Sequence, residues 1–518
     1  MRVVRFVRHA FSIVALLPST LPVALHAQAA AGASVDPLAT IEWSFTAASD
    51  VTAIVLGPRE AGALLVLAKE GVVAIDAATG AQLWAREDLR YVPPANLTLL
   101  EPWGHGLLLG EEVLQILDVR TGQTVSSSSV WPAAEVRGFF AVEGSDLALV
   151  VAKTGTSNRT LFAVDVDSGE VRWQRDDVFT RDPEFQQVPS GRRRGIMDLT
   201  TRTLAGSQPP VMDTDSTAIV YWSEDGPVKV HLGTGAVIWR AEALEGKDVP
   251  LRSGGYASIR VVAGVAYVAQ ENSLHALRAD DGRALWARPS GLPGRVMQMA
   301  FTDAGVLVRG AKPNGEGALR DDRFVSLVDT ETGTSVWSNR SSQFEHTAPF
   351  ALRGDTVYLA TREKLVSVSI SDGSAQDVAS FRFEDGQAPI LVEPRADGVL
   401  LLATHNLLLL DRLGAPVYQR AYTPPGTGFF ARLGSEFLAR PLARTVTVLG
   451  ERYVHVVAEG EDSSGRESLS LVQVDKEDGS ETARVWLSAN PRDYEVDSAT
   501  GMAYLVLGDK QVVAAALR

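Results

Sequence analysis

The chain has 518 residues, of which 45% are hydrophobic and 22% charged, so it can bury a large core, and disorder is excluded as its main state. It contains no cysteine, which excludes a disulfide framework, a thiolate metal site, a cysteine nucleophile and a lipid-modified N-terminal cysteine. The formal net charge of -14 argues against nucleic-acid binding, because a general nucleic-acid surface needs a basic footprint.

The first residues show the three parts of a secretory signal. Arginines stand near the start, an apolar stretch covers residues 10–25, and small residues suited to cleavage follow from Ala27 to Ala29. Prolines break the apolar stretch, which is too short for a membrane span of about 20 apolar residues. We therefore predict a signal peptide at residues 1–29 and a periplasmic or secreted mature chain with no transmembrane segment and no lipid anchor.

One pattern recurs along the rest of the chain. It consists of a short apolar segment, an Asp, a Gly four residues later and a Trp four residues after the Gly. Complete copies end at Trp84, Trp173 and Trp337, two further copies replace the Asp, and the weaker copies lack the Trp. The spacing averages about 49 residues, and the Asp position of the units is occupied by Asp76, Asp118, Asp165, His231, Arg278, Asp329, Ser369, Asp411, Asp475 and Ala516.

Each unit contains four short β-rich runs and no convincing amphipathic helix, which is typical of β-propeller blades. The Asp and Gly suit a hairpin turn between the third and fourth strands, because Asp accepts hydrogen bonds from nearby amides and Gly supplies a positive φ. The Trp is then expected to pack against the neighbouring blade. We predict an all-β protein, a single closed β-propeller of four-stranded blades over residues 38–518.

The number of blades follows from the units. Ten are counted, and eight or nine blades are the alternative, with insertions in the long intervals 165–231 and 411–475. The last unit stops after its third strand, whereas Thr40 to Phe45 resembles a fourth strand without its blade. Pairing of these two segments would complete the last blade and cover both sheet edges.

Residues Ala74 to Trp84 match the string Ala-x-Asp-x-x-Thr-Gly-x-x-x-Trp at every fixed position. In this the chain resembles the pyrroloquinoline-quinone-like (PQQ-like) β-propeller repeat family. The resemblance implies a propeller and leaves the activity open, since the family includes quinoprotein dehydrogenases and non-enzymatic relatives such as the outer-membrane assembly propeller. The best-known rings of both kinds have eight blades.

A quinoprotein dehydrogenase of this family would hold PQQ with calcium, bound by Glu, Asn and Asp, above a Trp, often beside a vicinal cysteine pair. The cysteine pair is absent here, and the repeat uses six tryptophans, leaving Trp103, Trp131, Trp222 and Trp486. Because Trp222 lies outside the repeat, we expect it to contribute less to stability than the repeat tryptophans.

No catalytic residue and no metal site can be assigned from motifs, and a cofactor-binding site stays unknown. The segments Asp165 to Asp167 and Asp213 to Asp215 resemble fragments of calcium loops, but a solvated turn is the favoured interpretation. The histidines show no paired ligand spacing. The basic run Arg192 to Arg194 lies in the polar insertion Thr180 to Thr203, which reads as a surface loop or, less simply, as a site for an anionic partner.

Ligands of a propeller often meet the channel that the first strand of each blade lines. Four charged residues fall on or beside such strands and are the places to look: Glu101, Arg260, Arg353 and Glu393.

The residues favour a non-catalytic protein, although enzyme activity stays open. We predict an exported binding or assembly scaffold of the cell envelope, with a protein or an envelope component as partner, no nucleic acid and no cofactor. The alternatives are a PQQ-dependent oxidoreductase, which would use PQQ with calcium, and a polysaccharide- or peptide-binding envelope module. The oligomeric state and the identity of the partner are not readable from the sequence.

Overall fold

The computed structural model describes residues 41–517, apart from 101–103, 110–112, 134, 143–144, 156–159, 179–209, 245–258, 271, 313–321, 341–349, 384–386, 404, 424–447, 450–451, 462–464, 466 and 488–490. The chain divides into two units, Met1–Asp36 and Pro37–Arg518. The predicted signal peptide lies in the first unit, outside the described residues. Everything below concerns the second unit.

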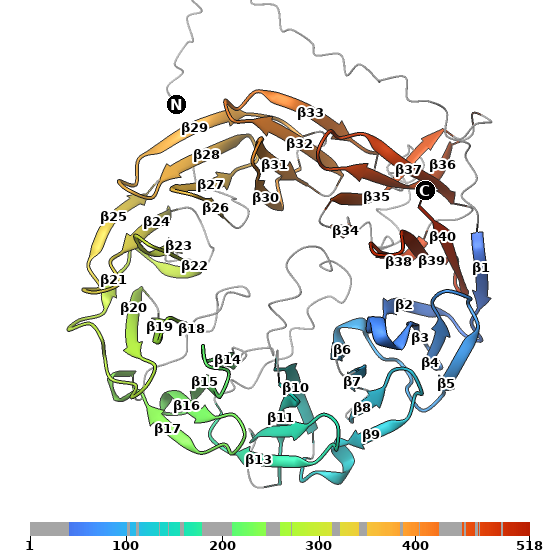
Figure 1. Ribbon diagram of the computed structural model, residues 1–518, viewed down its shortest axis with the longest axis horizontal. Helices are drawn as coiled ribbons and strands as arrows, with labels where there is room; N and C mark the ends of the chain where they lie inside the picture. The colour runs from blue at the N-terminus through green and yellow to red at the C-terminus, as the bar shows by residue number, and fades with distance from the viewer. Residues whose placement is uncertain are drawn as a thin grey trace, which may run out of the picture. The chain divides into compact units, whose positions relative to one another are not determined.

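The described residues form ten four-stranded antiparallel sheets, which we call blades 1 to 10 in chain order (Figure 1). The first strands, nearest the centre of the ring, are β2 (Val51–Leu56), β6 (Leu97–Leu100), β10 (Glu135–Ala141), β14 (Val211–Met212), β18 (Ile259–Val262), β22 (Arg295–Thr302), β26 (Ala351–Arg353), β30 (Leu391–Pro394), β34 (Val448–Leu449) and β38 (Pro491–Asp497). The second strands are β3 (Ala63–Ala68), β7 (His105–Leu109), β11 (Leu147–Lys153), β15 (Ala218–Ser223), β19 (Val265–Gln270), β23 (Gly305–Lys312), β27 (Thr356–Ala360), β31 (Gly398–Leu402), β35 (Tyr453–Glu461) and β39 (Met502–Leu507).

The third strands are β4 (Gly71–Asp76), β8 (Leu114–Asp118), β12 (Thr160–Asp165), β16 (Gly226–His231), β20 (Ser273–Arg278), β24 (Asp322–Val328), β28 (Lys364–Ser369), β32 (Asn406–Asp411), β36 (Glu467–Asp475) and β40 (Gln511–Ala516). The outer strands are β5 (Gln82–Arg86), β9 (Thr124–Ser127), β13 (Val171–Arg175), β17 (Val237–Arg240), β21 (Ser290–Gly291), β25 (Ser335–Arg340), β29 (Ala375–Ser380), β33 (Pro416–Ala421), β37 (Glu481–Leu487) and β1 (Ile41–Thr46). Four short 3-10 helices occur in connections: η1 (Arg59–Ala61), η2 (Pro94–Asn96), η3 (Ser128–Val130) and η4 (Glu242–Leu244).

The all-β propeller prediction is confirmed, and within the described residues the blade number is ten rather than eight or nine. The described parts of the long intervals 165–231 and 411–475 hold no extra blade. Each contains the connection from an outer strand to the next blade's inner strand, β13 to β14 and β33 to β34. Parts of both connections, including the predicted loop at Arg192 to Arg194, lie outside the described residues.

The core of the ring lies between blades rather than at its centre. Second strands are buried on both faces because each is covered by a neighbouring blade on either side, and every residue of β3 is buried. Ten clusters of buried apolar side chains each join two consecutive blades, and one of them joins blade 10 to blade 1. The amide of Ile54 in blade 1 also donates to the Asp493 carboxylate in blade 10, at 3.0 Å.

The outer strand of blade 10 comes from the other end of the described chain. Strand β1 pairs antiparallel with β40, placing Trp43 opposite Ala514 and Thr46 opposite Gln511. The N-terminal strand predicted at Thr40 to Phe45 therefore lies beside the C-terminal strand. Its Trp43 is buried against blade 1, where its indole Nε1 donates to the carbonyl oxygen of Ala77 at 3.1 Å.

The repeated Trp and Gly form a contact between consecutive blades. The indole of Trp286 in blade 5 lies against Gly333 in the turn of blade 6, and a Cβ placed on Gly333 would come within 2.5 Å of the ring. Gly333 has a φ of +72°, so the turn needs glycine for its conformation as well as for the space. The same stacking pairs Trp43 with Gly80, Trp84 with Gly122, Trp173 with Gly235, Trp239 with Gly282, Trp337 with Gly373 and Tyr418 with Gly479.

Each of these aromatic side chains also donates a hydrogen bond to a backbone carbonyl oxygen of the next blade. The bond from Trp173 Nε1 to Leu232 measures 2.6 Å and the bond from Trp337 Nε1 to Ile370 measures 2.7 Å. The Tyr418 hydroxyl replaces the indole in blade 8 and donates to Lys476 at 2.6 Å. Packing of the repeat Trp against the neighbouring blade is therefore confirmed.

One expectation about an individual tryptophan is wrong, and a second, the stability ranking of Trp222, stays a prediction. Trp286 is not part of a fourth strand: β21 has only two residues, and Pro289, which has no N–H for the ladder, precedes it. Trp222 lies in the second strand β15 and is only 2% exposed, within the apolar cluster between blades 4 and 5. Trp222 is more buried than Trp84, so its burial does not favour a smaller contribution to stability than that of the repeat tryptophans.

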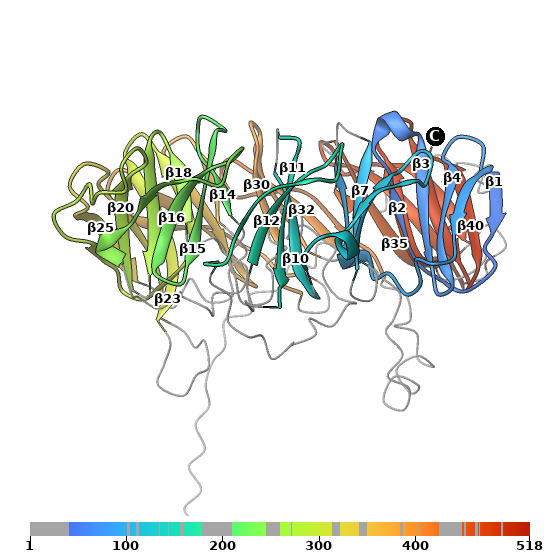
Figure 2. The same ribbon diagram turned by 90° about the horizontal axis from the view of Figure 1, so that it is seen from below.

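The two faces of the ring differ in their connections (Figure 2). Turns from first to second strand and from third to fourth strand lie at one face, which we call the turn face. Turns from second to third strand and the connections to the next blade lie at the other, which we call the connection face. Most of the residues that the structure does not describe belong to segments between a second and a third strand or between two blades.

Candidate binding grooves at the outer rim

Three of the four charged residues predicted near the channel lie on first strands, each in a different blade. Arg260 is exposed on β18 and Arg353 is exposed on β26. Glu393 on β30 accepts a hydrogen bond from Lys476 Nζ of blade 9 at 2.8 Å, so it takes part in an ion pair between blades. Glu101 lies outside the described residues.

The two segments that resemble calcium loops are both turns held by other contacts. The Asp165 carboxylate accepts hydrogen bonds from the Ser168 amide at 2.8 Å and from the Arg172 guanidinium. The Asp213 carboxylate is 5% exposed and forms a buried ion pair with Lys229, whose Nζ also donates to the Ala279 carbonyl at 2.8 Å.

Within the described ranges, no three His, Asp or Glu side chains gather closely enough to hold a metal ion. A search of the same residues for a helix long and apolar enough to cross a membrane finds none.

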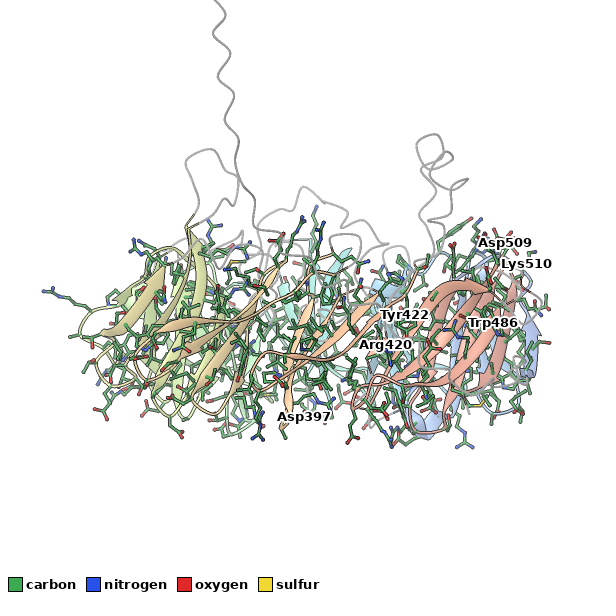
Figure 3. The ribbon with its side chains drawn as sticks, turned by 90° about the horizontal axis from the view of Figure 1, so that it is seen from above. Asp397, Arg420, Tyr422, Trp486, Asp509 and Lys510 are labelled. Carbon is green, nitrogen blue, oxygen red and sulfur yellow. The ribbon has the colours of Figure 1, made fainter. Side chains whose placement is uncertain are left out.

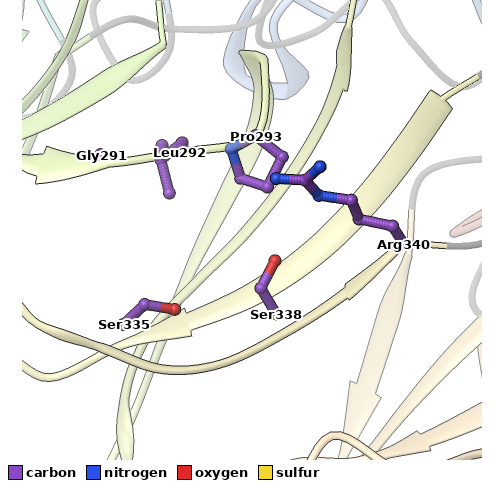
Figure 4. A pocket seen from close by; sticks show the side chains of 6 residues that line it. All are labelled: Gly291, Leu292, Pro293, Ser335, Ser338 and Arg340. Atoms are coloured by element: carbon purple, nitrogen blue, oxygen red, sulfur yellow. The ribbon is translucent and has the colours of Figure 1, made fainter.

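Among the described residues, two grooves at the outer rim each open between the outer strands of consecutive blades. One, the blade 5–6 groove, has a volume of about 470 Å³ (Figure 4). It exists where the outer strand of blade 5 is reduced to the short β21. Its lining contains one charged side chain and no aromatic ring: Gly291, Leu292, Pro293, Ser335, Ser338 and Arg340.

The second groove, the blade 8–9 groove, has a volume of about 370 Å³ and a richer lining. One wall is the end of β33 and the two residues after it, and the other consists of β35 and β37. The lining residues include two aromatic and four charged ones: Ala421, Tyr422, Thr423, Glu459, Gly460, Glu461, Glu481, Arg484 and Trp486. Figure 3 labels Tyr422 and Trp486.

Backbone contacts fix the first wall. The Tyr422 amide donates to the His405 carbonyl at 2.9 Å, which holds the residue against blade 8. The Glu459 amide donates to the Thr423 carbonyl at 2.9 Å, so the backbone just after β33 is hydrogen-bonded to the second strand of blade 9. Strands β35 and β36 have nine residues each, longer than any other described strand, which extends blade 9 along the groove.

Blade 9 departs from the repeat, and its tryptophan lies in the second wall of the groove. Each repeat Trp stacks on the Gly in the third-to-fourth-strand turn of the next blade. Blade 10 has no such turn, because β40 and β1 are not consecutive in the chain. Blade 9 carries the small Ala483 at the repeat position, buried against blade 10, as blades 2 and 7 carry Ser126 and Asp377 at theirs. Its tryptophan, Trp486, lies on the opposite face of β37 and lines the groove.

Arg484 lies beside Trp486 on the same face of β37. Its guanidinium carbon is 5.4 Å from the centroid of the Trp486 ring, a cation–π distance. Its Nη2 donates to both carboxylate oxygens of Glu481 at 2.8 Å, and Nη1 donates to the buried Ser470 hydroxyl at 2.8 Å. Gly460 leaves open the space where a side chain would contact both Arg484 and Trp486.

The Tyr422 hydroxyl is buried and, among the described residues, makes no hydrogen bond of normal geometry. Burial raises the pKa of Tyr422, and the nearby Glu481 carboxylate adds to this effect. The phenol therefore stays protonated at neutral pH.

Sequence reasoning missed two features of the rim. It left Trp486 outside the repeat and did not predict that this side chain lines a groove. The signal that could have indicated it is the absence of a Trp at position 483, three residues earlier. It also missed a contact two residues after the repeat aromatic. Arg86 Nη1 donates to the Gly122 carbonyl at 2.7 Å, and Arg420 Nε donates to the Gly479 carbonyl at 2.6 Å. Each side chain is therefore hydrogen-bonded to the turn of the next blade.

Comparison with known proteins supports the repeat assignment. The family profile described as outer membrane protein assembly factor BamB matches residues 224–400. This confirms the predicted resemblance to PQQ-like propeller repeats. No curated protein sequence matches the chain.

Solved structures similar to this chain include BamB from Moraxella catarrhalis, 13% identical with a TM-score of 0.34, covering 92% of this chain and 99% of that one. Quinohemoprotein alcohol dehydrogenase from Comamonas testosteroni is 13% identical with a TM-score of 0.35, covering 92% and 76%. A structure titled as the eukaryotic initiation factor is 10% identical with a TM-score of 0.44, covering 88% and 94%.

Proposed function

We propose that this PQQ-like repeat propeller is an exported, non-catalytic binding or assembly scaffold of the cell envelope, periplasmic or secreted. The observation that carries the proposal is the blade 8–9 groove. There Trp486, Arg484 and Tyr422, none of which stands at the aromatic position of the repeat, line an opening at the outer rim. Aromatic and arginine side chains are enriched where proteins bind other proteins.

A second line of support is the use made of the repeat residues. Trp84, Trp173 and Trp337 each donate a hydrogen bond to the next blade and stack on its turn glycine. These side chains are engaged in holding the ring together. The predicted signal peptide and the match to an envelope assembly factor profile support the location.

The competing activity is a PQQ-dependent oxidoreductase, and it can be tested directly. Mature protein is mixed with PQQ and calcium, passed through gel filtration and assayed with alcohols and sugars and an artificial electron acceptor. We expect no retained quinone and no oxidation. Stoichiometric binding with turnover would replace the scaffold by an enzyme.

The scaffold itself is tested by site-specific photo-cross-linking. A photoreactive residue replaces Thr423 in the blade 8–9 groove or, as the matched control, Ser335 in the blade 5–6 groove, and mature protein is exposed to envelope extract with and without quinone and calcium. We expect one discrete cross-linked protein from position 423 under both conditions. If neither position nor any other rim position captures a discrete partner, the scaffold proposal fails.

A further inference from the structure

We propose that the blade 5–6 groove binds an oxyanion, a phosphate or a carboxylate, at the guanidinium of Arg340. The inference goes beyond the proposed function, because it concerns the other groove and does not require a partner protein. It is carried by the hydrogen-bond donors of the lining, by the charges of the two walls and by the contrast with the blade 8–9 groove.

The outer strand of blade 6 places two polar side chains in the groove. Arg340 lies opposite Phe324, which packs in the apolar cluster between blades 5 and 6. Side chains paired across two strands share a face of the sheet, so Arg340 faces blade 5, and Ser338, two residues earlier in the same strand, does too. Figure 4 shows Arg340 extending toward Pro293 on the opposite wall, with the Ser338 hydroxyl pointing into the same space.

The guanidinium of Arg340 is not engaged by the fold. The other arginines of the outer strands each donate to a carboxylate or to a backbone carbonyl oxygen: Arg86, Arg172, Arg175, Arg240, Arg420 and Arg484. Arg340 is exposed, and neither an ion pair nor a hydrogen bond joins its side chain to another described residue. It therefore keeps the planar set of N–H donors that matches an oxyanion.

Ser338 supplies a further donor. Its hydroxyl lies 2.8 Å from that of Ser326, which is fully buried. Because a buried hydroxyl keeps its proton in a hydrogen bond, Ser326 is the expected donor of this pair. The proton of Ser338 is then available to a ligand, whereas Ser335 donates its own to the Trp337 carbonyl at 3.2 Å.

The walls of the groove are basic on an acidic protein. The two chain segments that bound it, residues 284–295 and 335–340, contain Arg288, Arg295 and Arg340 and no Asp or Glu. The whole chain has a formal net charge of -14, so an anion is repelled from most of the surface and attracted to this part of the rim. The groove volume of about 470 Å³ has room for a phosphate or for the end of an acidic side chain.

The blade 8–9 groove provides an internal comparison. It also opens at the outer rim, with a volume of about 370 Å³. Its arginine, Arg484, already donates to both carboxylate oxygens of Glu481. An anion should therefore discriminate between the two grooves although both are open.

Chemical modification locates the binding. Mature protein is treated with phenylglyoxal, which modifies accessible arginines, and peptide mass spectrometry measures the rates at Arg340 and at Arg353. Arg353 is the matched control, because it is also exposed and has no ion pair with a described residue. Inorganic phosphate and the blocked peptides Gly-Gly-Glu-Gly-Gly and Gly-Gly-Gln-Gly-Gly are added separately, with sodium chloride keeping the ionic strength constant. We expect phosphate or the glutamate peptide to slow modification of Arg340 by at least about twofold and to leave Arg353 unchanged.

The ligands separate two sources of the oxyanion. Protection by phosphate alone would assign the groove to free phosphate, and protection by the glutamate peptide alone would assign it to a carboxylate on a polypeptide; both results support the proposal. Equal protection of Arg340 and Arg353, protection by the glutamine peptide, or no protection by any ligand would overturn it.

Variants provide a second measurement. Equilibrium dialysis compares binding of the protecting ligand to the unmodified protein, to Arg340→Gln and to Arg353→Gln. Both side chains are exposed, so both variants should fold normally. Arg340→Gln should weaken binding by about two- to fivefold and Arg353→Gln should leave it unchanged. Equal effects would mean that overall charge rather than the groove attracts the anion, which would overturn the proposal.

Discussion

Replacement of Trp43 by alanine tests how strongly the last blade is joined to the first. The side chain is 9% exposed, packs against Gly80 and Tyr504, and donates to the Ala77 carbonyl at 3.1 Å. Burying a tryptophan removes about 150–250 Å² from water. At about 25 cal/mol per Å², this corresponds to about 4–6 kcal/mol. Trp-to-Ala replacements in cores cost about 3–5 kcal/mol, so we expect Trp43→Ala to lose about 4 kcal/mol.

The matched control is Ile41→Ala in the same strand. Ile41 is 57% exposed and should cost under about 1 kcal/mol. Both variants are compared with the unmodified protein by urea unfolding and by hydrogen exchange of the β40 amides, which pair with β1. Trp43→Ala should raise exchange in β40 and Ile41→Ala should not. If the two variants agreed within about 1 kcal/mol, the reasoning about the joint between blades 10 and 1 would be refuted.

Three further predictions concern other parts of the ring. Gly333→Ala should destabilise the protein by at least about 1 kcal/mol more than Gly62→Ala, as measured by thermal melts. Both glycines have a positive φ, but only Gly333 faces an aromatic ring at 2.5 Å. Equal losses of stability would mean that φ alone determines the effect. Lys229→Met should lower the free energy of unfolding by about 3–5 kcal/mol, because it leaves the buried Asp213 unpaired. Adding Asp213→Leu should restore part of this loss in urea unfolding. Losses that simply add in the double variant would contradict the prediction. Burial alone would raise the pKa of Asp177, but hydrogen bonds from Arg175, Arg240 and Tyr221 outweigh burial and lower the pKa. The carboxylate therefore stabilises the fold above pH about 4, and this contribution is lost as the pH falls through the lowered pKa. Asp177→Asn should therefore melt lower at pH 7 and converge with the unmodified protein in acid, and a constant difference across pH would count against the assignment.

The repeat made most of the fold predictable. Asp76, Gly80 and Trp84 recur at fixed spacing because most blades use the same turn and the same contact to their neighbour. A signal repeated along the chain survives local exceptions such as His231 and Arg278, and the count of ten units matches the ten sheets of the described residues.

The groove could not be predicted in the same way. Tyr422 and Trp486 are 64 positions apart in sequence and meet because blades 8 and 9 are adjacent, which no local pattern states. The side of β37 that faces the groove depends on register, and register depends on the bulge between Gln473 and Val474 in its pairing with β36. The burial of Trp222 was not predicted for a related reason, since it comes from the next blade and not from its own segment.

The pairing of β1 with β40 gives the ring a non-covalent seam inside one blade. Ile41 lies opposite Ala515, so this pairing closes the longest loop in the described chain and should form late in folding. The two ends of the described chain are neighbours at the seam, whereas in the other blades the third and outer strands are consecutive in the chain. A circular permutant that links these ends and opens at the turn after Asp329 would move the seam to blade 6, which would then need no Trp from blade 5 to cover its turn. The choice of seam therefore determines which blade lacks a covalent turn between its third and outer strands.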